Sequence, residues 1–146
     1  MIIHYFDSSL VLAILFEENT QDTAYNIWQS NNVRVSSVLL KIETNNALMR
    51  YHKLRKNCLD SGWLDKKRLQ LNAFLRDVFY SEITEKFADS MAENYTLANC
   101  KSLDAIHIAT ALNIKSNPNN SDIRLCSFDK KMLATAGQFG IETQGG

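Results

Sequence analysis

Short apolar runs alternate with helical patterns along the whole chain, and this alternation limits most strongly the folds that the chain can adopt. Residues 2–6 have the length and the β-branched, aromatic character of a buried strand, and Ser8 or Ser9 is placed to cap a helix that extends to Phe16. The alternation predicts an α/β fold, a parallel sheet of four to five strands flanked by helices in three α/β/α layers. Further strands are expected at 33–36, 78–83, 123–128 and near Ile141, and further helices at 20–29, 38–56, 60–75, 84–95, 102–112 and 130–136.

The length and composition predict a single domain that spans residues 1–146. Only 5 Gly and 1 Pro argue against a collagenous or turn-dense all-β chain, and 45% hydrophobic residues argue against disorder. Two polar stretches are expected to connect elements: Asn31 and Asn32 form a turn, and residues 116–122 form a loop.

Cysteine usage and the apolar runs bear on the compartment. The cysteines Cys58, Cys100 and Cys126 are odd in number and form no C-x-x-C pair, which argues against a disulfide framework and a zinc knuckle. The longest apolar run, 10–16, is far shorter than the roughly 20 residues of a membrane helix. The first residues lack a basic segment and a small-residue cleavage site, so we expect a cytoplasmic protein without a membrane span.

Four acidic residues stand where the predicted elements would bring them together. Asp7 and Asp129 directly follow predicted strands, while Glu43 and Asp104 lie in the first turns of predicted helices. Four carboxylates at one end of a sheet repel one another unless a cation neutralises them. Oxygen ligands without a Cys or His cluster favour Mg²⁺ or Mn²⁺, which points to phosphodiester chemistry.

Each acid alone has an ordinary structural explanation as a helix cap or a partner of the helix dipole. It is their joint placement that indicates a metal site. Asp122 precedes its predicted strand, so it is expected at the opposite end of the sheet and is excluded from the site.

Several motifs, in this order along the chain, resemble one known family. They are Tyr-Phe-Asp-Ser-Ser at 5–9, Glu43 after Ser-Ser-Val-Leu-Leu-Lys-Ile, Ser-Leu-Asp-Ala-Ile-His-Ile-Ala-Thr-Ala at 102–111, and Cys-Ser-Phe-Asp at 126–129. Together they resemble the PIN-domain family, and most closely its VapC-like toxin ribonucleases. The resemblance implies a magnesium- or manganese-dependent RNA endonuclease that is dimeric and is paired with a small antitoxin protein.

The resemblance also assigns roles to single residues. Asp7, Glu43 and Asp104 match the family's three principal acids, and Asp129 matches a more variable fourth. Two hydroxyl residues support them: Ser9 matches a position beside the first acid, and Ser127 stands where the family often has Thr.

Binding of RNA would have to rely on local basic residues, because 16 Lys plus Arg balance 16 Asp plus Glu. Arg50 lies two turns beyond Glu43 on the predicted helix, and Lys130 and Lys131 follow Asp129. These three are possible phosphate contacts, although solvated helix faces explain most such residues. His107, one turn beyond Asp104, is expected to pack or to hydrogen-bond a carboxylate.

Two other functions remain open from the sequence. One is a non-catalytic PIN-like module whose acidic pocket binds a basic peptide, which absence of Mn²⁺ binding would favour. The other is an aspartate-based phosphotransfer protein. That alternative is weakened because such proteins require adjacent acids or Asp-x-Asp after the first strand, whereas this chain has Asp7-Ser8-Ser9.

Overall fold

The computed structural model of the protein describes residues 2–30, 33–120 and 122–146. All five strands found in these segments form one parallel sheet: β1 (Ile3–Phe6), β2 (Arg34–Ser37), β3 (Phe79–Ser81), β4 (Ile123–Cys126) and β5 (Glu142–Gln144). Their order across the sheet is β3-β2-β1-β4-β5, so the first strand of the chain is the central one.

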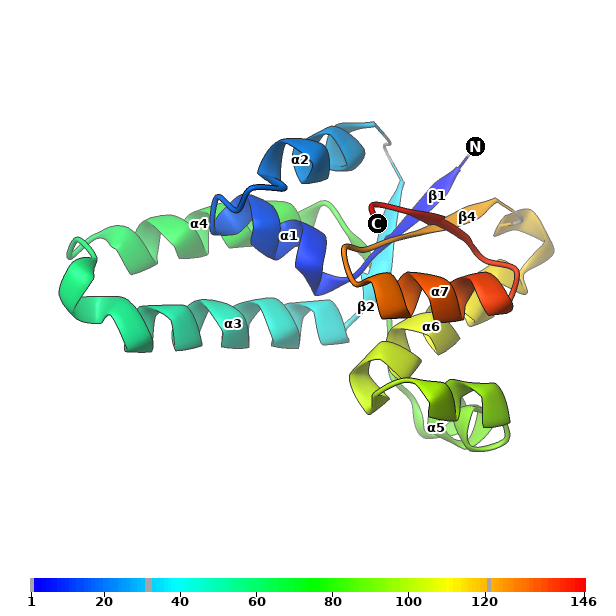
Figure 1. Ribbon diagram of the computed structural model, residues 1–146. Coiled ribbons are helices and arrows are strands. Elements are labelled where there is room, and N and C mark those ends of the chain that lie inside the picture. The colour runs from blue at the N-terminus through cyan, green and yellow to red at the C-terminus, as the bar shows by residue number, and fades with distance from the viewer. Residues whose placement is uncertain (1, 31–32, 121) are drawn as a thin grey trace.

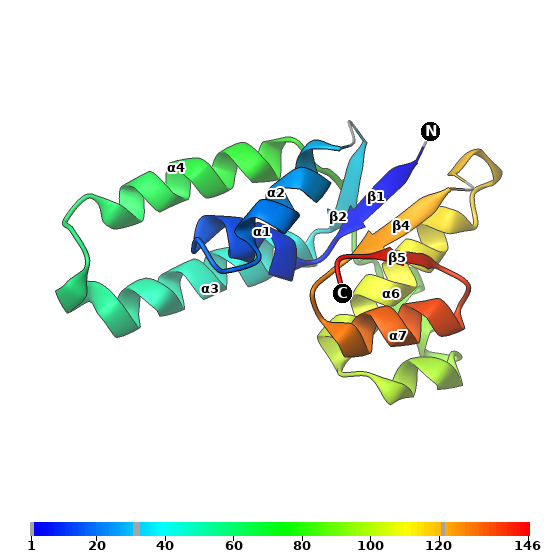
Figure 2. The same cartoon turned by 45° about the horizontal axis from the view of Figure 1, so that its top comes forward.

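Helices cover both faces of this sheet (Figures 1 and 2). The described segments contain α1 (Ser8–Leu15), α2 (Gln21–Gln29), α3 (Leu39–Arg55), α4 (Trp63–Arg76), α5 (Glu85–Ala92), α6 (Ser102–Lys115) and α7 (Lys130–Gln138). Residues of α1 to α4 build the core on one face, and residues of α5 to α7 build the core on the other. In both views α3 and α4 lie side by side and project away from the sheet.

The pleat of the strands divides the core between these two layers. Side chains of successive strand residues point to opposite faces. Phe6 and Cys126 accordingly pack with α1 to α4, while their neighbours Tyr5 and Leu125 pack with α5 to α7. All four side chains are fully buried, so the ends of β1 and β4 are held firmly between the layers.

The predicted three-layer fold is confirmed, but the ends of several strands and helices differ from the prediction for physical reasons. The strand predicted at 78–83 is shorter, because β3 is an edge strand whose Phe79 is exposed. The strand predicted at 123–128 ends at Cys126, because only Ser127 still donates to β5, at the Gln144 carbonyl, while the backbone nitrogens of Phe128 and Asp129 donate to serine hydroxyls. The helix predicted at 84–95 ends at Ala92, and a separate 3₁₀ turn, Tyr95–Asn99, follows.

Two predicted connections fall partly on residues outside the description. The turn predicted at Asn31 and Asn32 lies outside the described residues, as does Ser121 of the loop predicted at 116–122. Within that loop, Pro118–Asn120 form a single 3₁₀ turn.

Candidate active site

The chain changes its direction across the sheet between β1 and β4. From β1 it proceeds through β2 to the β3 edge, and it then returns to the other side of β1 to form β4 and β5. Parallel sheets of this kind bind ligands at such a switch point, outside the carboxyl ends of the strands. Asp7 directly follows β1 and Ser127 directly follows β4, so both lie at this crevice.

Asp7 is buried at this position, with 4% of its surface exposed. It caps α1: its Oδ1 accepts hydrogen bonds from the Ser9 backbone nitrogen (3.0 Å) and the Ser9 hydroxyl (2.6 Å). Its Oδ2 accepts one from the Ser127 hydroxyl (2.8 Å). Burial raises the pKa of Asp7, and it outweighs these bonds and the nearby His107, which lower it. A cation beside Asp7 would offset the cost of burying its charge.

Two serines connect the loop after β1 to the loop after β4. The Ser127 hydroxyl, which donates to Asp7, also accepts a hydrogen bond from the Asp129 backbone nitrogen (2.9 Å). The Ser9 hydroxyl accepts one from the Phe128 backbone nitrogen (3.0 Å). The two hydroxyl oxygens are 3.4 Å apart. These bonds fix the positions of Asp7 and Asp129 relative to each other.

Glu43 approaches the crevice from the second turn of α3 and is bonded to a buried histidine. Its Oε1 lies 2.6 Å from Nε2 of His107, and Nδ1 of His107 lies 2.7 Å from the Tyr5 hydroxyl. That hydroxyl also accepts a hydrogen bond from the Ser37 backbone nitrogen (3.2 Å). Burial raises the pKa of Tyr5, so the phenol keeps its proton.

Sequence reasoning gave Tyr5 no role and His107 only packing or an unspecified carboxylate partner. The spacing of His107 from Asp104 indicated that it lies near an acid, but the partner is Glu43 of another helix. No local signal identified Tyr5, because an aromatic residue in a central strand is ordinarily a packing residue.

Asp104, in the first turn of α6, is half-buried. It interacts electrostatically with Asp129 and with the pair of Glu43 and His107. Burial raises its pKa most, and the charges of Asp129 and Glu43 raise it further, while His107 lowers it. Like charges act this way only over short distances in a protein. The four predicted acids therefore gather at one end of the sheet.

The carboxylates fit the donor chemistry of a hard cation in an open coordination sphere. As the side chains stand, no three His, Cys, Asp or Glu residues within 2–30, 33–120 and 122–146 are close enough together to hold a metal ion. Mg²⁺ is usually bound by only one or two carboxylates and keeps several waters, which substrate phosphates can replace. Burial raises the pKa of Asp7, and burial together with the charges of Asp129 and Glu43 raises the pKa of Asp104, so a cation would stabilise both carboxylates. A hydrated Mg²⁺ or Mn²⁺ fits these acids better than a closed cage of four ligands.

Comparison with known proteins agrees with this fold. The family model described as PIN domain matches residues 4–138. This chain belongs to the PIN-domain family. PIN domains are generally nucleases, which act on RNA and typically use divalent metals.

A solved structure shows the same fold. The crystal structure of PAE2754 from Pyrobaculum aerophilum superposes with a TM-score of 0.65 at 18% sequence identity, covering 97% of this chain and 83% of that chain. No curated protein matches the chain. The resemblance to the PIN-domain family expected from the sequence motifs is therefore confirmed, and the fold with it, while the resemblance to VapC-like toxin ribonucleases stays a prediction.

Of the three basic residues predicted to contact RNA, Lys130 and Lys131 directly follow Asp129, and Arg50 lies two turns beyond Glu43 on α3. Lys130 and Lys131 begin α7 and are exposed, and the backbone nitrogen of Lys131 donates to Oδ1 of its cap, Asp129 (3.0 Å). Arg50 is exposed on α3, where it lines a depression of about 770 Å³ with neighbouring residues of that helix and of the 3₁₀ turn that follows it. These neighbours are Asn46, Met49, His52, Lys53, Leu54 and Lys56.

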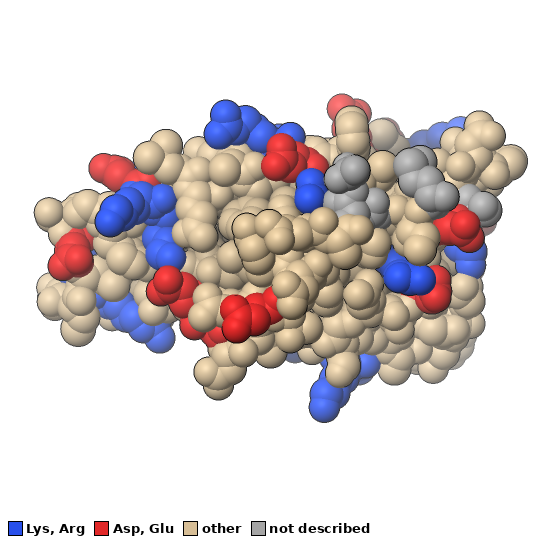
Figure 3. Space-filling view, turned by 90° about the horizontal axis from the view of Figure 1, so that it is seen from above, with Lys and Arg blue, Asp and Glu red and all other residues tan. Residues whose placement is uncertain are grey.

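Charge is mixed elsewhere on the surface. On the face seen in Figure 3, Lys and Arg side chains are interspersed with Asp and Glu, and neither sign forms a continuous patch. No helix in the part of the chain that the structure describes is long and apolar enough to cross a bilayer. Attraction of a polyanion would therefore depend on local basic positions such as the α3 depression.

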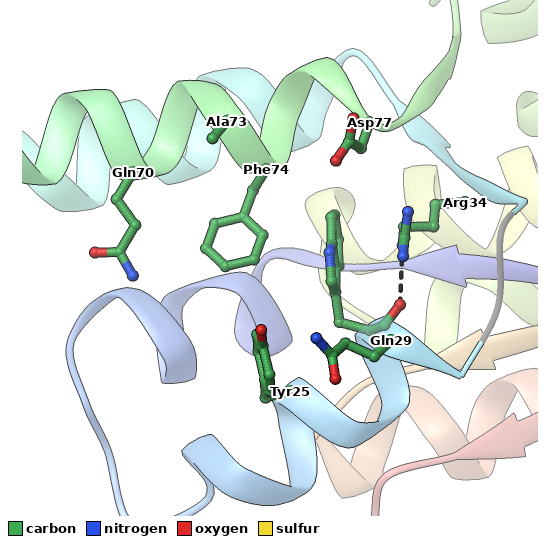
Figure 4. Close-up of a pocket in the computed structure, with 8 residues that line it drawn as sticks. Tyr25, Gln29, Arg34, Gln70, Ala73, Phe74 and Asp77 are labelled. Carbon is green, nitrogen blue, oxygen red and sulfur yellow. Dashed lines mark hydrogen bonds between the residues drawn. The ribbon is translucent and has the colours of Figure 1, made fainter.

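A second cavity, of about 370 Å³, lies away from the acids (Figure 4). Arg34, the first residue of β2, lines it, so it is at the opposite end of the sheet from Asp7. The Arg34 guanidinium lies over the Trp28 ring at 4.7 Å, and its Nε donates to the Trp28 carbonyl at 2.9 Å. The Arg34 guanidinium of this cavity is thus already bound by Trp28. The remaining lining residues are Tyr25, Gln29, Gln70, Ala73, Phe74 and Asp77.

Proposed function

We propose that this PIN domain is a Mg²⁺- or Mn²⁺-dependent endoribonuclease that hydrolyses RNA phosphodiester bonds at the crevice between β1 and β4. The observation that carries the proposal is the hydrogen-bonded link at this crevice, in which the Ser127 hydroxyl donates to Asp7 and accepts from the backbone nitrogen of Asp129. Asp104, in the first turn of α6, is near enough to Asp129 and Glu43 for their charges to raise its pKa, after the larger effect of burial.

Each group has a part in such a reaction. Asp7, Glu43, Asp104 and Asp129 would hold the hydrated cation, one or two of them directly and the others through its waters, and Ser9 and Ser127 would keep Asp7 and Asp129 in place. When bound, the metal polarises the scissile phosphate, activates a water and stabilises the leaving oxygen. The acids supply the fixed negative charge that binds the metal, and no covalent protein nucleophile is needed.

The test is cleavage of structured RNAs by the purified protein with Mg²⁺, with Mn²⁺ and with chelator. We expect chelator to abolish cleavage. Asp104→Asn should lower the rate by about 10²- to 10³-fold, because several kcal/mol of charge stabilisation are lost. The matched control is Asp122→Asn, an exposed acid just before β4 at the other end of the sheet. Equal cleavage by wild type and Asp104→Asn would refute the proposal.

Arg50, Lys130 and Lys131 are proposed to contact RNA phosphates. Arg50 is supported by its place in the basic depression along the helix that carries Glu43. Arg50→Ala should weaken RNA binding about equally for different sequences and should lower the salt dependence by about one phosphate contact. Lys115→Ala, eleven residues beyond Asp104 and about 16 Å along α6, removes the same charge far from the acids and should change neither.

The biological setting is proposed from the resemblance to VapC-like toxins. In this proposal residues 1–146 form a single domain, the protein acts in the cytoplasm as a homodimer, and a small antitoxin protein neutralises it. Sedimentation of the purified chain tests the dimer. Rescue of growth on co-expression with a neighbouring small reading frame tests the antitoxin.

A non-catalytic PIN-like binding module is the second candidate. It is favoured by one observation: no three potential ligands in the described segments are close enough together to hold a metal. Calorimetry separates the two functions, because a catalytic site must bind Mn²⁺ and a module that binds a basic peptide need not.

A further inference from the structure

One buried polar side chain is not explained by the four acids and the two serines. His107 is only 1% exposed, among apolar side chains of α6 and the sheet. A buried imidazole is costly unless its nitrogens are bonded. Here both nitrogens have partners, Tyr5 at 2.7 Å and Glu43 at 2.6 Å.

One direction of these hydrogen bonds satisfies every donor and acceptor. The Glu43 carboxylate accepts from Nε2 of His107, and the Tyr5 oxygen, which accepts from the Ser37 backbone N–H, can donate its own proton to Nδ1. A neutral imidazole that accepts at Nδ1 carries its proton on Nε2 and donates it to Oε1 of Glu43. The hydrogen bonds thus lead from the Ser37 backbone of β2, through Tyr5 of the central strand and His107, to the Glu43 carboxylate.

Glu43 needs an external partner more than Asp7 and Asp129 do. Asp7 and Asp129 have short side chains that are held by backbone nitrogens of their own helices. Glu43 has one more rotatable bond and a 20% exposed side chain. Fixing such a side chain costs up to about 1.5 to 2 kcal/mol of rotamer entropy, which a preformed hydrogen bond offsets before any ligand arrives.

We propose that His107, itself held by the Tyr5 hydroxyl, is a positioning residue that orients the Glu43 carboxylate for metal binding. This inference rests on the proposed metal-dependent function. Outer hydrogen-bond partners of metal ligands typically contribute 10- to 100-fold in metal affinity or activity. His107 acts through Glu43 and does not itself bind the metal or the RNA.

The experiment measures Mn²⁺ affinity by calorimetry, without RNA, for four variants. His107→Leu should bind Mn²⁺ about 10- to 100-fold more weakly than wild type. His107→Gln keeps an amide donor near the Nε2 position and should recover most of the affinity. Tyr5→Phe removes only the hydroxyl and should give a smaller loss. Thr135→Val, which removes a buried hydroxyl bonded within α7, is the control and should leave the affinity unchanged.

Two further readouts separate positioning from mere stability. The ¹⁵N shifts of His107 should show a proton on Nε2 and none on Nδ1, and a proton on Nδ1 alone would overturn the proposed direction of the bonds. In RNA cleavage at saturating Mn²⁺, His107→Leu should lower kcat more than it raises KM, because Glu43 is not an RNA contact.

The outcomes also distinguish this inference from the proposed function. If wild type binds Mn²⁺ and Asp104→Asn does not, the metal site stands; wild-type affinity in His107→Leu would then overturn the positioning role alone. If wild type binds no Mn²⁺, both fall. A loss of affinity in His107→Leu that His107→Gln restores would support the inference.

Discussion

Removing the Ser127 hydroxyl tests the link between the two loops of the crevice. Ser127 is fully buried, donates to the Asp7 carboxylate at 2.8 Å and accepts from the Asp129 backbone nitrogen at 2.9 Å. A hydrogen bond to a charged group contributes about 1.5 to 3 kcal/mol and a neutral one about 0.5 to 1.5 kcal/mol. Ser127→Ala should therefore destabilise the metal-free protein by about 2 to 4 kcal/mol when Asp7 is ionised.

This destabilisation should depend on pH. The pKa of Asp7 is raised above its ordinary value of 3.8, so Asp7 contributes stability that is complete below that value and is lost as pH rises through the folded pKa. The Ser127 bond lowers this pKa, so its removal raises it further and makes the loss with pH larger. When Asp7 is protonated the lost bond is a neutral one, and the cost falls by about 1 kcal/mol or more.

The assay is urea unfolding in chelator, followed by tryptophan fluorescence from about pH 4 to about pH 8. Ser36→Ala is the matched control, because Ser36 is equally buried but donates to a neutral acceptor, the Phe6 carbonyl at 2.6 Å. Its cost should be about 0.5 to 1.5 kcal/mol at every pH. If Ser127→Ala costs the same at both ends of the range, or no more than Ser36→Ala, the charged bond to Asp7 does not exist as described.

Three further predictions concern stability without metal. Asp7→Asn should lose less stability than wild type as pH rises, because its amide does not titrate; parallel pH profiles in urea unfolding would contradict the raised pKa of Asp7. Leu40→Ala, at a fully buried position, should cost about 2 to 5 kcal/mol, and Leu54→Ala, at a 72% exposed one, less than about 0.5 kcal/mol. Thr84→Ala should cost about 1 kcal/mol in thermal unfolding, because the Thr84 hydroxyl caps α5; no change would show that the cap is dispensable.

The sequence predicted the parallel sheet because each strand is short, apolar and followed by a helix signal. It also predicted the position of Asp7, since a residue directly after a parallel strand stands at the carboxyl edge of the sheet, whereas Asp129 lies three residues beyond the end of β4 and not directly after it as predicted. Asp104 followed from the helix start at Ser102. These positions depend on local patterns, which one sequence contains in full.

Contacts between residues far apart in the chain could not be predicted from these local patterns. The pairs His107 with Glu43 and Tyr5 with His107 are 64 and 102 residues apart in the chain. Neither the period of a helix nor the alternation of a strand specifies which residues of α3 and α6 face each other. The extent of β3 was also wrong, because edge pairing depends on the neighbouring strand and not on local β propensity.

The presence of aspartate at two helix caps is itself an argument about function. Asp7 caps α1 and Asp129 caps α7, and serine or asparagine caps a helix about as well as aspartate does. At Asp7 the carboxylate has a cost that those residues would avoid, because burial raises its pKa despite three hydrogen bonds. Stability therefore explains a polar cap at this position but not a negative charge. A cation bound during catalysis would explain the charge, because it would offset the free-energy cost of burying the carboxylate and would use that carboxylate as a ligand.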